Sequence, residues 1–99
     1  MLANIWMIQS YGDKDTELLF RRERIKKLPQ ALQQRARNKL LIIHAATTEN
    51  DLNIPPGNRF EKLKGNKKGW CSMRINDQWR VLFKWAEGNA HDVIITDYH

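Results

Sequence analysis

The spacing of hydrophobic and polar residues changes once along the chain, from a helical period to alternation. Helices bury residues that recur every three or four positions, whereas half-buried strands bury every second residue. Residues 53–58 separate the two patterns and contain two prolines and a glycine, which remove backbone donors and impose turn dihedrals. The sequence therefore predicts helices first and strands afterwards, on either side of an irregular segment.

One short strand and one helix are predicted at the start of the chain. Residues 5–11 are apolar and β-prone and precede a turn-forming Gly-Asp pair, which favours a strand. Asp13 or Asp15 is then expected to cap a helix that runs towards Leu28.

A second helix is predicted over residues 29–46, with Pro29 in its first turn. An apolar stripe at spacings of four and three is expected to face the core, and it consists of Leu28, Leu32, Ala36, Leu40 and Ile43. The opposite face is expected to be polar and carries Gln33, Gln34, Arg37 and Asn38. His44 is interpreted as a half-buried residue near the helix end, because no second metal-binding side chain lies three or four residues away.

Alternation then predicts four strands, at residues 59–63, 70–75, 79–85 and 90–97. Their connections are short enough for an antiparallel meander. The predicted fold class is α+β: a short N-terminal strand, two helices, and a four-stranded antiparallel sheet whose apolar face the helices cover.

The third of these strands separates an aromatic face from a basic one. Its core face is expected to carry Trp79, Val81, Phe83 and Trp85. A tight turn at residues 76–78 would place Arg74, on the preceding strand, near Arg80 on the polar face.

Charge is concentrated in the β-rich half of the chain. The 99 residues, enough for a single domain, include 17 Lys and Arg against 11 Asp and Glu, for a net charge of +6. Residues 59–84 alone hold eight basic side chains and two acidic ones. Such a density attracts phosphate chains, so a polyanionic partner is predicted.

Cys71 is the only cysteine, which excludes a disulfide framework and makes the cytoplasm the expected compartment. In a strand pattern it is expected to be a small buried hydrophobe. Residues 1–8 are apolar-rich but lack a basic flank and are too short for a signal peptide or a membrane span. No segment of the sequence requires a membrane.

Five short blocks together resemble one family: MIQSY at residues 7–11, PPGNR at 55–59, LKG at 63–65, RINDQWR at 74–80 and the final DYH at 97–99. In combination they closely resemble HigB toxins, which belong to the RelE/ParE superfamily of bacterial toxin-antitoxin systems. The resemblance covers residues 7–99 and implies a single RelE-like toxin domain over residues 1–99. Residues 1–6 are then expected to be an N-terminal extension.

The resemblance implies a type II toxin that is a ribosome-dependent, metal-independent endoribonuclease. Such a protein enters the A site of the bacterial ribosome, cleaves mRNA during translation and arrests growth. The resemblance also implies a HigA-type helix-turn-helix antitoxin, which neutralises the toxin and links it indirectly to operator DNA. No cofactor is expected.

RNA cleavage without a metal needs a base, positive charge on the phosphorane and an acid. In the family, activity is associated with the residues that match Lys64, Arg80, Asp97, Tyr98 and His99. Arg80 is the first candidate for phosphate stabilisation because a planar guanidinium can hold two oxygens, although pairing with Asp77 or another carboxylate is the structural alternative. An imidazole can exchange protons near neutral pH, so His99 suits acid-base chemistry.

Five further cations are predicted to bind the RNA backbone without taking part in chemistry: Arg59, Lys62, Lys67, Lys68 and Arg74. One departure from the family is Glu61, since some members carry a histidine at this position. Which side chain is the base and which is the acid stays open. Two other functions also stay open, namely a ParE-like toxin that acts on DNA gyrase without cutting RNA and a plain nucleic-acid-binding module.

Overall fold

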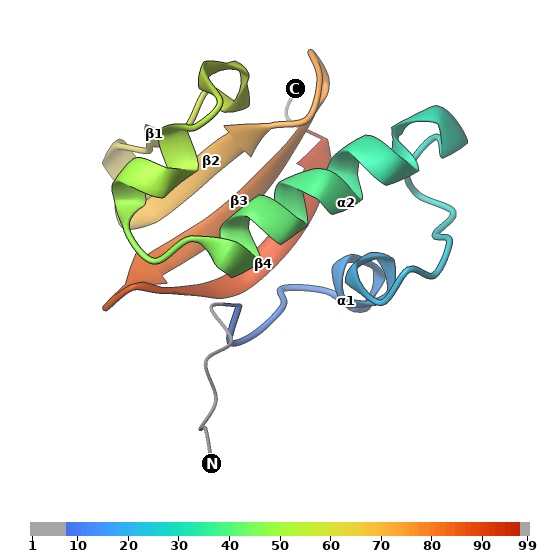
Figure 1. The fold of residues 1–99 in the computed structure, drawn as a ribbon, viewed down its shortest axis with the longest axis horizontal. Helices are drawn as coiled ribbons and strands as arrows, with labels where there is room; N and C mark the ends of the chain where they lie inside the picture. The colour runs from blue at the N-terminus through green and yellow to red at the C-terminus, as the bar shows by residue number, and fades with distance from the viewer. Residues whose placement is uncertain (1–7, 98–99) are drawn as a thin grey trace.

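The computed structural model describes residues 8–97, in which α2 crosses one face of a four-stranded antiparallel sheet and α1 lies beside it next to β4 (Figure 1). The elements are α1 Lys14–Phe20, α2 Gln30–Ala45, β1 Glu61–Lys62, β2 Trp70–Arg74, β3 Trp79–Ala86 and β4 Asn89–Asp97, with 3-10 turns η1 Glu49–Asn53, η2 Pro56–Asn58 and η3 Gly65–Lys67. The strands follow one another in the order β1-β2-β3-β4, which confirms the predicted α+β class. The predicted extension at residues 1–6 lies outside the described residues.

The predicted first strand is present only as isolated pairings in the described part of the chain. Ile8 and Tyr11 form parallel bridges to Ala90 and Val93 of β4. The reason for the interruption is an irregularity in β4, where Asp92 has φ +54° and donates its backbone N–H to the Ser10 hydroxyl at 2.9 Å. Residues 5–7 of the prediction lie outside the described residues.

The first helix begins where its sequence predicts but ends earlier. Asp13 is the N-cap and accepts a hydrogen bond from the Thr16 backbone N–H at 2.9 Å. The helix ends at Phe20, not near Leu28, because Arg22 adopts a left-handed conformation with φ +72°. The chain then continues as an irregular segment up to α2.

The structure also differs from the prediction on α2, where Gln33 contacts this irregular segment. Gln33 was expected on the polar face, but it is buried, with an exposure of 8%. Its side chain accepts from the Ile25 N–H at 3.2 Å and donates to the carbonyls of Ile25 and Leu28 at 2.9 and 2.6 Å. Since buried backbone groups need partners, Gln33 replaces the hydrogen bonds that a longer first helix would have made. Pro29 stands at the N-cap, one residue before the first turn.

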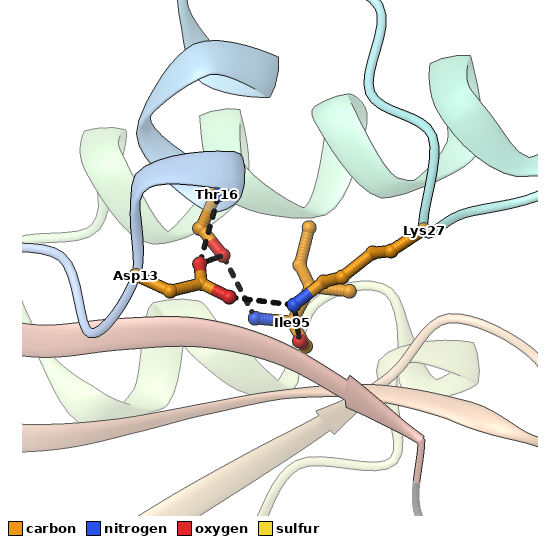
Figure 2. A network of polar contacts seen from close by, with 4 residues as sticks. All are labelled: Asp13, Thr16, Lys27 and Ile95. Atoms are coloured by element: carbon orange, nitrogen blue, oxygen red, sulfur yellow. Dashed lines mark hydrogen bonds and ion pairs between the residues drawn. The ribbon is translucent and has the colours of Figure 1, made fainter.

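A polar network fastens α1 and the irregular segment to β4 (Figure 2). Thr16, which is fully buried, donates to Asp13 at 2.6 Å and accepts from the Ile95 N–H at 3.0 Å. The Lys27 ammonium donates to Asp13 at 2.6 Å and to the Ile95 carbonyl at 2.7 Å. Four residues from three segments are therefore tied together in one place.

The core lies between α2 and the inner face of the sheet. Fully buried apolar residues from both sides meet there and include Leu40, Ile43, Val81, Phe83, Val93 and Ile95. Trp79 is buried as expected, and Trp85 packs half-buried against the same cluster. Trp70 is half-buried, with the Lys84 ammonium 4.9 Å from its ring centroid.

Candidate nucleic-acid interface

Two arginines lie directly opposite each other on neighbouring strands, as the sequence predicted. Arg74 ends β2 and pairs in register with Arg80 on β3. The connecting turn forms because the Asn76 side chain accepts from the N–H groups of Gln78 and Trp79 at 2.9 and 2.7 Å. Like charges directly opposite each other on neighbouring strands destabilise a sheet, so this arrangement concentrates positive charge at some cost in stability.

The Arg80 guanidinium is held against the outer face of the sheet. Its Nε donates to the hydroxyl of Ser72, which is fully buried, and its Nη2 donates to the Arg59 carbonyl at 2.9 Å. The Glu61 carboxylate lies 3.8 Å from Nη2. The Arg80 side chain is only 13% exposed, whereas that of Glu61 is 57% exposed. Arg80 is thus positioned before any ligand arrives. Glu61 is a carboxylate beside it, whereas Asp77 pairs with Arg74.

Asp97, a residue of the predicted site, ends β4 at the same end of the sheet as Arg80. Asp97 pairs in register with Trp79, the neighbour of Arg80, and accepts a hydrogen bond from the Gln78 side chain at 2.9 Å. Tyr98 and His99 come next in the chain and lie outside the described residues.

Lys64 lies towards the other end of β2 from Arg80. The N–H of its neighbour Leu63 donates to the Trp70 carbonyl at 2.9 Å, while Arg80 pairs with Arg74. These two positions on β2 are four residues apart, which corresponds to about 13 Å of backbone. The structure therefore does not gather the predicted cations around one point but spreads them along the strand.

Lys64 lines a hollow of about 440 Å³ at the end of β1. The other lining residues are Glu49, Lys62, Leu63, Gly65, Lys68, Gly69, Trp70, Cys71 and Trp85. Cys71 is buried, as expected, and burial raises the pKa of its thiol to about 11. The thiol is therefore protonated at neutral pH and is not an activated nucleophile.

The five cations predicted to bind the RNA backbone are all partly or fully exposed, but their surroundings differ. Arg59 has φ +46°, a conformation that shortens β1 relative to its prediction. Lys62 pairs with Glu49 at 2.8 Å across the hollow, and this hydrogen bond raises the pKa of the lysine. Lys67 and Lys68 are exposed in and just after η3.

Sequence reasoning missed Ser72, whose hydroxyl positions Arg80. Its position on the same strand face as Arg74 was the available signal in the sequence, but serine is too common in strands for this position to indicate a role.

His44 is half-buried in the last turn of α2, as predicted. Its ring centroid lies 4.9 Å from that of Phe20, and burial lowers the pKa of the imidazole.

Two kinds of feature are absent from residues 8–97. Those residues contain no group of three His, Cys, Asp or Glu side chains that could hold a metal ion. None of their helices combines the length and the apolar character needed to span a membrane.

The fold is shared with a solved structure, and the sequence matches a family model. The structure of the YoeB dimer from Staphylococcus aureus shares the fold, with a TM-score of 0.59 and 16% identity over 94% of this chain and 98% of that one. The sequence profile described as the RelE-like toxin of type II toxin-antitoxin system HigB matches residues 5–99.

Two curated relatives are similar to the chain over most of their length. Toxin HigB-1 of Vibrio cholerae serotype O1 is 46% identical over 85 residues, covering 86% of this chain and 81% of that protein. Endoribonuclease HigB of Proteus vulgaris is 30% identical over 93 residues, covering 94% and 100%. The chain belongs to the HigB family of RelE-like toxins, as its sequence blocks predicted, and membership of a type II system implies an antitoxin partner.

Proposed function

We propose that this chain is a ribosome-dependent endoribonuclease that cleaves translated mRNA without a metal ion, with Arg80 binding the scissile phosphate. The endoribonuclease name of the Proteus vulgaris relative supports the activity. The observation that carries the assignment of Arg80 is its fixed position between Ser72 and the Arg59 carbonyl, opposite Arg74. A preorganised cation stabilises developing charge without reorganising during the reaction.

The remaining proposed catalytic residues supply proton transfer and a second cation. Asp97 ends β4 in register with Trp79, the neighbour of Arg80, and it precedes Tyr98 and His99 in the sequence, so we assign acid-base chemistry to these three residues. Lys64 lies about four residues further along the edge of β2 and binds another phosphate of the same RNA strand. The RNA then runs along β2 from the Lys64 hollow to Arg80. The cations proposed to bind the RNA backbone flank this path, and they are Arg59, Lys62, Lys67, Lys68 and the partly exposed Arg74.

The proposed partners follow from the family. The antitoxin is a HigA-type helix-turn-helix protein, which connects the toxin to operator DNA, and the site of action is the A site of the bacterial ribosome. The single toxin domain spans residues 1–99 and works in the cytoplasm.

Cleavage of mRNA on translating ribosomes tests this function. Wild type is compared with Arg80→Ala, His99→Ala and the control Lys84→Ala, which removes an exposed cation from the same strand. We expect cleavage by wild type and the control and a loss of at least about 100-fold in Arg80→Ala, the usual effect of removing a charge-stabilising donor. Undiminished cleavage in both Arg80→Ala and His99→Ala would refute the site, and growth arrest with intact mRNA and damaged DNA would refute the activity.

A further inference from the structure

A second cluster of cations lies between α2 and the edge of β2, outside the residues assigned above except for Arg74. β1 pairs with β2 at Cys71 and Ser72, and the η2 turn also contacts β2. A pocket of about 260 Å³ opens there and is lined by Arg35, Lys39, Gly57, Arg74 and Ile75. Three of these five residues carry positive charge.

Acidic side chains do not balance this charge inside the pocket. No carboxylate is among the lining residues, and Asp77, the partner of Arg74, is 95% exposed and lies outside the lining. Burial, followed by repulsion from Arg35 and Arg74, lowers the pKa of the Lys39 ammonium. Arg35 and Arg74 are therefore close enough to Lys39 to disfavour its charged form, an effect that a bound anion in the pocket would oppose.

The fold also holds Lys39 in place. Its ammonium donates to the side-chain oxygen of Asn58 at 2.6 Å. Asn58 is fully buried and donates from the same side chain to the carbonyls of Leu52 and Ile54, both at 3.2 Å. An ammonium group has three donors, so this bond orients Lys39 without using its full capacity.

We infer that the pocket formed by Arg35, Lys39 and Arg74 binds a backbone phosphate of the RNA strand, next to the phosphate held by Arg80. The inference rests on the proposed function for the identity of the polymer. Arg74 connects the two positions, because it lines the pocket and pairs in register with Arg80. A strand held at both points is fixed in orientation as well as in place.

Substitutions at Gly57 test the anion pocket without removing any of its cations. A side-chain carbon built at Gly57 meets no atom within 4 Å, and this glycine is not among those with positive φ. Gly57→Asp therefore places a carboxylate in the pocket, and Gly57→Asn is the isosteric neutral control. Arg35→Gln removes a lining charge, and Lys14→Gln removes an exposed charge on α1 as its control.

The probe is a short single-stranded RNA with 2′-O-methyl groups, which cannot be cleaved through its 2′ oxygen, titrated at several salt concentrations. We expect several-fold weaker binding by Gly57→Asp than by Gly57→Asn, and by Arg35→Gln than by Lys14→Gln. The slope of log affinity against log salt should become shallower by about 0.7 for a lost phosphate contact. Equal affinities and slopes within both pairs would overturn the inference.

Inorganic sulfate separates an RNA phosphate site from a site for free anions. Sulfate should raise the unfolding temperature of Gly57→Asn more than that of Gly57→Asp, because a ligand that binds only the folded state stabilises it. A sulfate effect without any difference in RNA binding would overturn the assignment to RNA. Because binding is measured without cleavage, intact mRNA on ribosomes would count against the proposed function alone.

Discussion

The polar network around Thr16 and the outer face around Arg80 both place charged groups at β-strands, but they treat charge in opposite ways. At Thr16, the Lys27 ammonium and the Asp13 carboxylate bind each other, and Lys27 and Thr16 bind the backbone of Ile95. At Arg80, two arginines lie in register on neighbouring strands, and the carboxylates paired with them, Asp77 and Glu61, are more exposed than the arginines. The first arrangement joins elements of the fold, whereas the second retains positive potential at the surface.

This difference indicates which charged residues of a small domain are available to bind a ligand. A satisfied buried network contributes to stability and offers a ligand little. An arrangement of like charges lowers stability slightly but attracts phosphate groups. The same reasoning extends to Arg35, Lys39 and Arg74, where the lining contains cations without carboxylates.

The largest effect is expected from Arg80→Lys, which keeps the charge but loses the planar fork. Cleavage on ribosomes should fall by about 10- to 100-fold, since a charge-assisted hydrogen bond is worth about 1.5–3 kcal/mol. The free energy of unfolding in urea should fall by about 1 kcal/mol, because lysine lacks the Nε–H that bonds the buried Ser72 hydroxyl, so cleavage is compared between samples shown to be folded. If the lysine variant cleaved as fast as wild type, charge alone would explain the site.

Thr16→Val should damage stability and leave chemistry intact. The substitution preserves the side-chain shape but leaves the buried Ile95 N–H without its acceptor, at a cost of about 1–3 kcal/mol. Urea unfolding measures this cost, and Thr47→Val, which removes an exposed hydroxyl bond to Asp51, is the matched control. Equal stability of the two variants would mean that the network does not fasten α1 to the sheet.

Acid should weaken the same network through Asp13. Burial alone would raise the pKa of this carboxyl, but hydrogen bonds from Lys27 and Thr16 outweigh burial and hold the pKa below its ordinary value of 3.8. The contribution of Asp13 is therefore complete above the unfolded-state pKa and is lost as pH falls through the lower folded-state value.

Thermal unfolding of wild type and Asp13→Asn across pH 6 to pH 2 checks this sign, at roughly the acidic range where carboxyl groups titrate. Asparagine is an equally good N-cap, so the comparison isolates the charge. The stability difference should shrink towards low pH. A difference that grew on acidification would contradict the lowered pKa of Asp13.

The smallest effect is expected from Glu61→Gln, which removes the carboxylate 3.8 Å from Arg80. Because exposed ion pairs are worth about 0–1 kcal/mol, RNA affinity should rise by at most a few-fold. Glu23→Gln, on the exposed segment after α1, controls for the change in net charge. Weaker RNA binding by Glu61→Gln than by this control would show that Glu61 positions Arg80 productively.

The sequence by itself determined the features that depend on neighbouring residues. The periods of α2 and of the last three strands follow from local spacing, and the Asn76 turn sets the register that places Arg74 opposite Arg80. Such features need only the geometry of a helix, a strand or a turn, so they can be read along the chain.

Only the tertiary structure decided the features that join distant segments. Gln33 is buried because it satisfies the backbone around Ile25, and this contact accompanies the early end of α1. Lys39 and Arg74 are 35 positions apart in the sequence, yet the η2 turn and α2 bring them into one pocket. Periodicity assigns a residue to a face, but the identity of the segment packed on that face determines whether its charge is satisfied or remains available to a ligand.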